Sequence, residues 1–473
     1  MLHYCSCRRW TMFLGRDVEL KTIREELSSW NRKTAILVYG KRRVGKSTLI
    51  REAASDFAGV MINHLCVQST FEGNLELICR SVSQALGLPN MQFDSLSSLM
   101  AFLKEQEKRF LLIIDEYPYL KQTRKQNEVD SYMQSVIDQL PSNVKLILCG
   151  SYISIMKELL AESNPLFGRF SLILHLHDFD YYDAARFYPD MPVRDKVAFY
   201  SVFGGSPYVL ENLDAHASLQ DNIQRLVLPE TGIVRSHIEN IMLGEIRKNF
   251  DTRILEILGN GKKRYSEIAD SLKSVDTGLL EKQLKILQKM ETIRKTEPIN
   301  RQEYKKKKFY EITDNLMRFY FSFIFGSAGT ISRIGGEQFF LMNIKGERLR
   351  QFISRRLEGI VLQFFHRMAG HGDYMDITDF GSYWYDDPVT KTNGEFDCVL
   401  KRQDEKYDFF ECKYFDREMT LDECLQEEQQ VRRQPRLNVN HLGFVNTGGF
   451  AFSNHHSYIL IDGEDLFHLP AAI

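Results

Sequence analysis

The first third of the chain alternates short, almost purely apolar runs with longer segments in which apolar residues recur at helical spacing. The apolar runs are Ala35–Tyr39, Gly59–Asn63, Phe110–Ile114 and Val144–Cys149. Strands covered by helices on both faces have this continuous apolar character. Segments such as Asn74–Leu86 and Val129–Leu140 lie between them with helical periodicity. We therefore predict an α/β domain over residues 13–175, a parallel sheet wrapped by helices.

The pattern changes three times after this domain. Residues 176–245 are mostly helical in pattern, with a break at Gly204-Gly205-Ser206-Pro207, and predict a helical lid. Residues 246–315 predict a winged-helix domain, because short helices precede two strand-like pieces. Residues 316–473 predict a separate α/β domain. The strand-like segments of these last two domains are Thr292–Thr296, Lys308–Ile312, Asp376–Tyr385, Glu395–Leu400, Tyr407–Lys413, Leu442–Asn446 and Tyr458–Ile461.

Composition and charge narrow the class of protein. The 473 residues are 43% hydrophobic and 26% charged, which is typical of a globular chain of about three domains. The net charge of -2 excludes a basic field over the whole chain, so any nucleic-acid surface must be local. No apolar run reaches the roughly 18 residues of a membrane span, so no membrane partner is expected. Eight scattered cysteines without a C-x-x-C pair favour a reduced, cytoplasmic location. Residues 1–12 lack the apolar stretch of a secretory signal and are interpreted as a tail, with Met12 as an alternative start.

A phosphate-binding motif follows the first apolar run. The segment matches G-x-x-x-x-G-K-[ST] and precedes a helix-compatible run from Ser47 to Ala54. Its glycines let backbone N–H groups point at phosphate oxygens, while Lys46 reaches the β and γ phosphates and Ser47 holds Mg²⁺. The sequence therefore predicts ATP and Mg²⁺ as cofactors. The nucleotide-binding residues are Gly40, Lys41, Arg42, Arg43, Val44, Gly45, Lys46, Ser47 and Thr48.

Two carboxylates end the run at Phe110–Ile114. Asp115 is expected in the magnesium shell and Glu116 is expected to orient the attacking water, which predicts hydrolysis in addition to binding. Ser151 follows Val144–Cys149 and lies beside the γ phosphate if that strand neighbours the strand of Asp115. Arg169 is a candidate arginine finger, acting in its own subunit or in a neighbour. The alternatives stay open: Ser151 as a helix cap, Arg169 in an ion pair, and an ATPase that binds without turnover.

These motifs resemble the archaeal-type ATPases of the AAA+/STAND group. Phe13-Leu14-Gly15-Arg16-Asp17-Val18-Glu19-Leu20 resembles the F-x-G-R-x-x-E-L box that helps form the adenine pocket in that group. Gly205-Ser206-Pro207 resembles the G-x-P of its lid helices, which implies that Pro207 lies near the nucleotide. Members commonly continue into a winged helix and a C-terminal domain similar to PD-(D/E)XK nucleases. The resemblance therefore implies a restriction-endonuclease-like fold for residues 316–473.

A carboxylate and lysine pattern lies within that last domain. Strand alternation puts Glu411 and Lys413 on one face, and pairing with the preceding strand brings Asp397 beside Glu411. Asp397 and Glu411 are then candidate magnesium ligands, and Lys413 would activate water or stabilise a phosphate. Glu358, on the apolar helix Leu357–Met368, matches the helical glutamate that such nucleases place beside the metal. A solvated charged hairpin is the structural alternative.

The predicted winged helix carries the local positive charge. Residues 251–310 hold 15 Lys and Arg against 9 Asp and Glu, an excess of six. Lys282, Lys285 and Lys289 share one helix face, opposite an apolar face of Leu280, Leu284 and Leu287. We interpret this segment as a recognition helix, with Lys305–Lys308 in a wing that contacts phosphates. DNA is the favoured partner, and protein contacts through this domain stay open.

The combined interpretation is a cytoplasmic P-loop ATPase whose nucleotide state moves the lid, the winged helix and the nuclease-like domain. Two alternatives remain, a non-cutting signalling switch and a transcriptional regulator. A homo-oligomer is possible, with Arg42 or Arg43 contacting phosphate or a neighbouring subunit. His175 and His177 alternate on a strand-like run and are interpreted as packed or surface residues, not zinc ligands.

Overall fold

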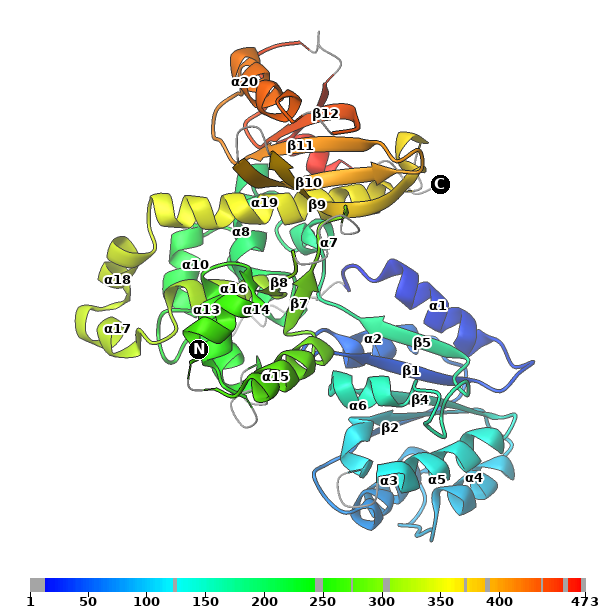
Figure 1. Cartoon of the computed structure of the whole chain (residues 1–473). Coiled ribbons are helices and arrows are strands. Elements are labelled where there is room, and N and C mark those ends of the chain that lie inside the picture. Colours follow the sequence, from blue (N-terminus) through cyan, green and yellow to red (C-terminus); the bar gives the residue numbers. More distant parts are fainter. Residues whose placement is uncertain are drawn as a thin grey trace, which may run out of the picture. The chain divides into compact units, whose positions relative to one another are not determined.

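The computed structural model describes residues 13–121, 126–242, 250–273, 275–300, 307–369, 372–387, 392–434, 437–453 and 458–468. The chain divides into two compact units between Asp178 and Phe179 (Figure 1). The predicted N-terminal tail, residues 1–12, and Lys305 and Lys306 of the predicted wing lie outside the described residues.

The first unit is built on a five-stranded parallel sheet. Its strands are β1 (Ala35–Gly40), β2 (Val60–Leu65), β3 (Phe110–Asp115), β4 (Val144–Gly150) and β5 (Leu172–Leu176). The spatial order is β2-β3-β4-β1-β5, so β4 lies between the strand that leads into the P-loop and the strand that ends at Asp115. The four predicted strands and the α/β class are confirmed, and β5 is an additional edge strand.

Helices cover both faces of this sheet because its central strands are buried at nearly every position and almost entirely apolar, with the buried Lys145 of β4 as an exception. On β1, Ile36 and Val38 pack on one face while Leu37 and Tyr39 pack on the other. The first face is covered by α1 (Asp17–Ser28) and α2 (Lys46–Ala53). The second is covered by α3 (Phe71–Leu86), α4 (Leu96–Lys104), α5 (Gln126–Asp138) and α6 (Ile153–Glu158). A short 3-10 helix, η1 (Tyr117–Lys121), follows β3.

The second unit begins with a helical segment that continues into a winged-helix arrangement. The helical elements are α7 (Tyr181–Ala185), α8 (Val193–Phe203), α9 (Pro207–Leu210), α10 (Leu219–Leu226), α11 (Ile233–Ser236) and the π-helix η2 (His237–Met242). Next come α13 (Arg253–Gly259), β6 (Lys263–Arg264), α14 (Tyr265–Ser271), α15 (Thr277–Lys289), β7 (Ile293–Thr296) and β8 (Phe309–Ile312). The three strands form an antiparallel sheet in the order β6-β8-β7.

A mixed five-stranded sheet completes the second unit. The helices before it are α16 (Asn315–Phe323), α17 (Ala328–Ile334), α18 (Gly336–Asn343) and the long α19 (Glu347–Met368). Its elements are η3 (Gly372–Tyr374), β9 (Ile377–Asp387), β10 (Thr392–Arg402), β11 (Tyr407–Lys413), α20 (Leu421–Arg432), β12 (Val439–Asn446), β13 (Ile459–Asp462) and α21 (Gly463–Phe467). In the order β13-β12-β11-β10-β9, the strands β9 to β11 are antiparallel and β11 to β13 are parallel.

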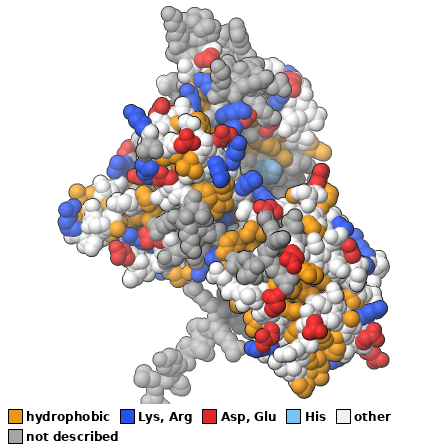
Figure 2. All heavy atoms as spheres, turned by 60° about the horizontal axis from the view of Figure 1, so that its bottom comes forward, with side chains coloured by type: hydrophobic (Ala, Val, Ile, Leu, Met, Phe, Trp, Pro, Cys, Tyr) orange, Lys and Arg blue, Asp and Glu red, His pale blue; other side chains and the backbone are white. Residues whose placement is uncertain are grey.

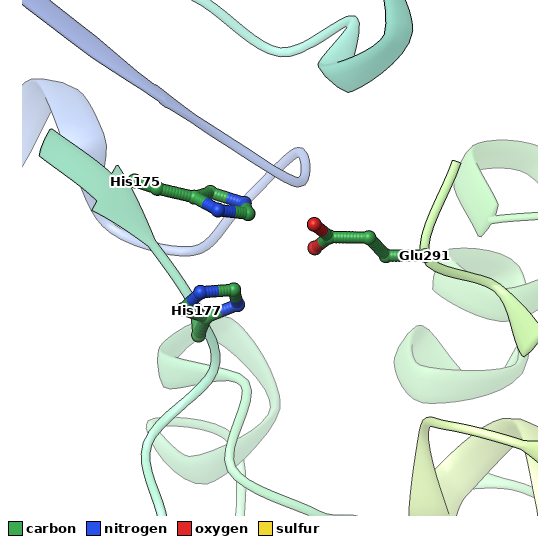
Figure 3. A group of neighbouring side chains, drawn as sticks. All are labelled: His175, His177 and Glu291. Carbon is green, nitrogen blue, oxygen red and sulfur yellow. The ribbon is translucent and has the colours of Figure 1, made fainter. Parts of the chain in front are cut away.

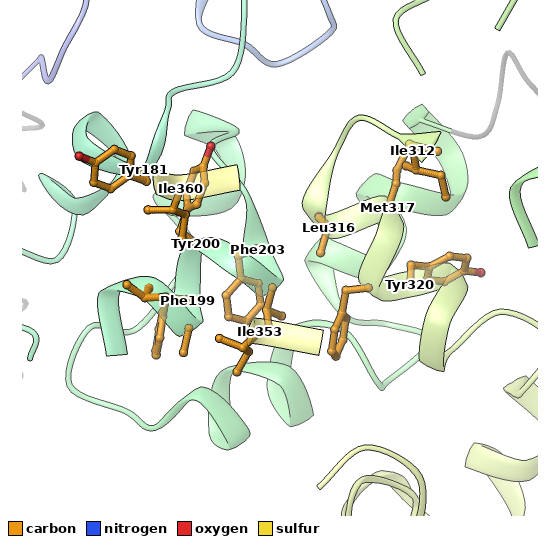
Figure 4. Close-up of a cluster of buried hydrophobic side chains, with 14 of the residues drawn as sticks. Tyr181, Phe199, Tyr200, Phe203, Ile312, Leu316, Met317, Tyr320, Ile353 and Ile360 are labelled. Atoms are coloured by element: carbon orange, nitrogen blue, oxygen red, sulfur yellow. The ribbon is translucent and has the colours of Figure 1, made fainter. Parts of the chain in front are cut away.

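One hydrophobic core joins the parts of the second unit. Phe203 of α8, Leu316 of α16 and Ile353 of α19 belong to the same buried cluster (Figure 4). The Tyr181 hydroxyl, near the beginning of the second unit's sequence, donates to the backbone oxygen of Leu466, near its end, at 2.6 Å. Burial of each large apolar side chain contributes about 1.5–3 kcal/mol, so these segments stabilise one another.

The surface and the cysteines agree with the composition. Figure 2 shows basic and acidic side chains interspersed over the visible face, as the small net charge leads one to expect. Six cysteines within the described ranges are buried free thiols. Among the described helices, none has the length and apolar character that crossing a membrane requires.

Candidate functional site

The phosphate-binding segment, residues 40–48, leaves β1 and enters α2. Gly45 has φ 91°, a left-handed conformation that glycine adopts without strain. Gly40 lies so close to β5 that an added Cβ would stand 2.2 Å from the Leu176 backbone oxygen. Both glycines of the motif are thus required by the backbone itself, which curls tightly between the strand and the helix.

Lys46 lies buried at the start of α2, with 5% of its surface exposed. Its ammonium donates to the backbone oxygens of Gly40 and Lys41, at 2.9 and 2.8 Å, and to Ser151 Oγ at 2.9 Å. Burial lowers the pKa of Lys46, against the attraction of nearby Glu116 and Asp115. Neutral oxygens are its hydrogen-bond acceptors, so the arrangement suits an added anion such as phosphate.

Two carboxylates from β3 lie beside the phosphate-binding segment. Ser47 Oγ donates to Asp115 Oδ2 at 2.7 Å, which places two oxygen ligands of the kind that Mg²⁺ takes in P-loop proteins next to each other. Glu116 accepts hydrogen bonds from Ser151, at 3.2 Å from the backbone nitrogen and 2.6 Å from Oγ. Because β4 pairs with both β1 and β3, it brings Ser151 between Lys46 and Glu116. The donor set therefore fits magnesium and a triphosphate.

Arginines of the first unit surround this segment. Arg42 donates to Tyr119 Oη at 3.2 Å and to Tyr152 Oη at 2.8 Å. Arg16, from the predicted adenine-pocket box, donates to the Val44 backbone oxygen at 3.5 Å. The sequence pattern did not single out the two tyrosines, since each is distant along the chain from Arg42 and no motif marks it.

Arg169 lies at the other end of the sheet. Its guanidinium pairs with Asp138, 3.2 Å from Oδ1, and donates to the Phe167 backbone oxygen at 3.0 Å. Ser171, two residues on, bonds to the backbone oxygen of Ala35, where β1 begins. The six residues of β1 span about 20 Å, so Arg169 is far from the P-loop of its own chain. The contact with Asp138 is the ion pair that the sequence left open as an alternative, and an arginine finger acting in a neighbouring subunit stays a prediction.

Pro207, His175 and His177 are the remaining residues of this region that the sequence analysis discussed. Pro207 is the first residue of α9 in the second unit, and Gly205 before it packs against Phe179, where an added Cβ would stand 1.8 Å from the backbone oxygen. His175 and His177 lie side by side at the end of β5, with ring centroids 3.9 Å apart (Figure 3). His175 also stacks on Tyr39 at 4.4 Å, so the pair packs against its own sheet.

The carboxylates of the second unit gather in a pocket of about 220 Å³. We name it the acidic pocket and define it by the lining residues Glu358, Glu395, Asp397, Glu411 and Glu427. β10 and β11 pair next to Asp397 and Glu411, with Cys398 opposite Phe410, as the predicted hairpin requires. Glu358 shares a helical stripe with Val361 and Phe365, both buried, which turns it toward the sheet.

Charge inside the acidic pocket is concentrated. Burial raises the pKa of Glu358 to about 8, and the negative charges of Asp397 and Glu411 add to this rise. Burial likewise raises the pKa of Glu411, although Lys413 opposes it from 2.7 Å. Carboxylates are the ligand type that Mg²⁺ takes, so the chemistry of the lining suits a divalent cation. Among the described residues, however, no three of these carboxylates have ligand oxygens within 4.8 Å of one another, so a bound cation would have to draw them together.

Three side chains at this pocket were not assigned a role from the sequence. Glu427 of α20 lies 2.8 Å from Lys413 Nζ. Lys262, just before β6, lies 2.8 Å from Glu395 Oε2 and 3.0 Å from Asp397 Oδ1. Strand alternation identified Glu395 as a neighbour of Asp397, but no sequence signal connects Lys262 or Glu427 to the pocket, because both contacts form across different elements.

The predicted recognition helix is α15. Lys282, Lys285 and Lys289 are exposed along it, and Leu280 and its apolar neighbours are buried. Lys285 pairs with Glu281 at 2.7 Å, a solvent-exposed contact that contributes little to stability. The helix therefore presents a basic face outward.

Comparison with known proteins gives three matches along the chain. Residues 13–213 match an ATPase domain predominantly from Archaea, and residues 245–316 match an HxlR-like helix-turn-helix. Residues 320–429 match archaeal and bacterial proteins of unknown function. The first match agrees with the geometry around Lys46: residues 13–213 are similar to an archaeal-type P-loop ATPase domain, and the region that follows is similar to a helix-turn-helix.

Individual proteins resemble the chain over most of its length. An uncharacterized protein of Methanocaldococcus jannaschii, MJECL04, is 27% identical over 411 residues, which cover 86% of this chain and 88% of that protein. The Walker-type ATPase PABY2304 of Pyrococcus abyssi has a TM-score of 0.47 at 21% identity, covering 65% of this chain and 96% of its own. The ORC2 protein of Aeropyrum pernix, in ADPNP and ADP complexes, has a TM-score of 0.46 at 13% identity, covering 66% and 93%.

Proposed function

We propose that the chain hydrolyses ATP at the P-loop of its first unit. The observation that carries this proposal is a pair of hydrogen-bonded groups beside the P-loop. Ser151 accepts from Lys46 and donates to Glu116, and Ser47 donates to Asp115. Positioning and charge stabilisation dominate phosphoryl transfer, and these groups supply both.

Each residue has a distinct role in the proposed reaction. Lys46 and the backbone N–H groups at the start of α2 bind the β and γ phosphates, and Ser47 and Asp115 hold magnesium. Magnesium, when bound, supplies neutralisation of the charge that develops on the phosphate oxygens. Glu116 accepts a hydrogen bond from the attacking water and aligns it with the γ phosphorus, and Ser151 holds the Glu116 carboxylate in place.

The test is a comparison of ATP turnover and ATP binding in wild type and Glu116→Gln. We expect turnover to fall at least ~100-fold, because the amide is a poor acceptor for the proton of the attacking water, with ATP affinity retained. Glu128→Gln, at an exposed carboxylate of α5, serves as the control. Turnover that is equal in the Glu116 variant and the wild type would refute the assignment.

The second candidate function is metal-dependent cleavage of DNA in the acidic pocket. It is favoured by the presence of Glu358, Asp397 and Glu411 around one pocket, with Lys413 bonded to Glu411. The metal would be held by these three carboxylates, and Lys413 would stabilise the charge on the phosphate. DNA would be recruited through the basic face of α15.

The cleavage proposal is tested with Asp397→Ala and Lys413→Ala, using plasmid and linear DNA with Mg²⁺ or Mn²⁺. Asp404→Ala is a matched control, because this carboxylate lies in the exposed hairpin outside the pocket. We expect cleavage to be lost in the first two variants alone. If no variant cuts while ATP turnover persists, the non-cutting switch becomes the better description. If DNA binding persists as well, the result supports the alternative that the protein is a transcriptional regulator.

A further inference from the structure

Lys262 connects the winged-helix segment to the acidic pocket. Its ammonium lies within 3.0 Å of one oxygen on each of two lining carboxylates, Glu395 and Asp397. The side chain is 34% exposed and that of Glu395 is 13% exposed, so solvent screens this contact less than it screens a pair on the open surface. A cation of the chain itself therefore stands at the mouth of the pocket.

A second set of contacts attaches another part of the winged-helix region, residues 299 and 300, to the edge of the mixed sheet. The Ile299 backbone nitrogen donates to the Ser382 oxygen at 2.7 Å. The Asn300 side chain donates to the Trp384 backbone oxygen at 2.8 Å and accepts from its nitrogen at 3.2 Å. Ser382 and Trp384 belong to β9, the last strand of the sheet, so residues 299–300, which we name the wing segment, cover its outer edge.

Apolar contacts reinforce this docking. Ile299 is 8% exposed and packs in a small core with Tyr383 and Val399. Asn300 and Trp384 are also buried. Since Val399 lies two residues beyond Asp397 on β10, the wing segment and Lys262 both contact β10, and the wing segment contacts β9 as well. The position of the ammonium is thus set by a packed interface.

We infer that Lys262 is an internal counter-ion that holds the winged helix on the acidic pocket and excludes a divalent cation from Asp397. The inference rests on the proposed metal-dependent function of that pocket. A magnesium ion bonded to an Asp397 oxygen would stand about 2.1 Å from it. The ammonium stands 3.0 Å from Oδ1, so the two cations would compete for the same carboxylate and repel each other.

Two exclusive states follow from this competition. With Lys262 paired, the winged helix is docked and the pocket is closed to metal. When Lys262 withdraws, Asp397 and Glu395 become available to a divalent cation, and the wing segment loses one of its anchors. The contact therefore keeps the pocket inactive until Lys262 and the wing segment withdraw from it.

The experiment measures Mn²⁺ affinity by calorimetry on the full chain without nucleotide. The variants are Lys262→Gln and, as control, Lys263→Gln, which removes the same charge one residue further along, where the backbone pairs with Tyr310. We expect Lys262→Gln to bind Mn²⁺ at least ~10-fold more tightly than wild type, a change of about 1.4 kcal/mol. The control is expected to match wild type, and Asp397→Asn added to Lys262→Gln is expected to cancel the gain.

Hydrogen exchange on the same proteins gives a second readout. Peptides covering residues 297–300 are expected to exchange faster in Lys262→Gln than in wild type, and saturating Mn²⁺ is expected to speed them in wild type. Mn²⁺ affinity that is equal in wild type and Lys262→Gln overturns the inference and leaves the proposed metal site standing. Absence of Mn²⁺ binding in every variant overturns the metal site, and with it the exclusion of metal by Lys262. Thermal unfolding of each variant reports whether the second unit, which contains Lys262, is folded.

Discussion

Several residues near the P-loop, among them Arg43 at φ 65°, have backbone conformations that L-amino acids rarely adopt. Glu116 has φ 55°, and Gly45 has φ 91°. A left-handed conformation at a non-glycine residue costs on the order of 1–3 kcal/mol and is common at functional sites. At Glu116 it follows the last residue of β3 and coincides with the turn of the carboxylate toward Ser151. The strain is therefore associated with the direction of the side chain that we propose orients water.

Gly45 allows stability and nucleotide binding to be separated. Gly45→Ala is expected to cost about 1–2 kcal/mol through its backbone conformation and to weaken ATP binding, because the N–H groups at the start of α2 would be displaced. Gly87→Ala is the control: Gly87 has φ 66° at the end of α3, where an added Cβ meets nothing within 4 Å. It should lose similar stability with ATP affinity unchanged. Thermal unfolding and ATP titration measure the two effects.

His64 makes the first unit sensitive to acid. It lies on β2 with 4% exposure, near Ser81, and burial lowers its pKa to about 4. In the unfolded chain the pKa of histidine is near 6.5. Between pH 6.5 and pH 4 the unfolded chain therefore binds a proton at His64 and the folded chain does not. Stability contributed by neutral His64 is complete above pH 6.5 and is lost as the pH falls toward 4. The loss is at most about 3 kcal/mol.

Urea unfolding of the first unit at pH 7 and pH 4.5 tests this sign. Wild type is expected to lose more unfolding free energy between the two values than His64→Gln, whose side chain does not titrate. His216→Gln, at an exposed histidine of the second unit, should behave as wild type does. An equal acid sensitivity in wild type and His64→Gln would contradict the assignment.

At the scale of elements, α15 determines how salt would affect DNA binding. Each phosphate neutralised by a lysine contributes about 0.9 to the slope of log affinity against log salt concentration. Replacing Lys282, Lys285 and Lys289 by Gln is therefore expected to lower the slope by about 2–3 and to weaken binding to all sequences alike. Fluorescence anisotropy over a range of salt concentrations measures the slope.

A charge-matched control uses three lysines of the first unit. Gln at Lys21, Lys104 and Lys108 removes the same charge outside the helix-turn-helix. If the control lowers the slope as much as the α15 variant does, binding depends on general charge and the recognition helix is not its basis.

Local patterns predicted the elements that are buried on both faces. β1, β3 and β4 are apolar up to the turn that follows, apart from Lys145 of β4, and the sequence identifies them to within a residue. The sequence indicated β5 only as a strand-like run around His175 and did not include it in the predicted sheet, because it is a half-buried edge strand interrupted by that histidine. The sequence also identified Lys46 and Asp115, because each belongs to a short pattern of neighbouring residues that can be recognised without knowledge of the fold.

Contacts between distant segments could not be predicted. Arg42 meets Tyr119 and Tyr152, and Lys262 meets Asp397, through the packing of elements far apart in sequence. For Arg169, the short motif around it left an arginine finger and an ion pair equally open, because it did not reveal at which end of the sheet the residue would lie. Side-chain type and spacing indicate which reaction a set of residues could catalyse. Whether those residues lie close enough to act together depends on how the helices and strands that carry them pack.

At the scale of the molecule, the second unit should unfold as one body. The sequence suggested a lid, a winged helix and a further α/β domain, since an amphipathic helix does not reveal its partner. The structure gives them one core around Phe203, which is 1% exposed. Phe203→Ala is expected to cost about 3–5 kcal/mol and to speed hydrogen exchange in all three segments together.

Phe110→Ala provides the comparison, because Phe110 is equally buried in β3 of the first unit. It should speed exchange in the first unit and leave the second unit as it is. Exchange that increases only in the helical segment of the Phe203 variant would show that the three segments unfold independently. Cooperative unfolding would mean that any motion of the lid is transmitted to the winged helix and the acidic pocket.

The covered edge of β9 has a consequence for assembly. Wherever the wing segment detaches, the backbone groups of Ser382 and Trp384 lose their partners, and an aromatic strand becomes available at the margin of the sheet. Such margins pair readily with strands from other molecules. Detachment of the wing segment would therefore expose an edge to which the wing segment of a second copy can bind. Two copies would then exchange wing segments, and the fraction of molecules with a detached wing segment would rise with protein concentration, together with the fraction that self-associate.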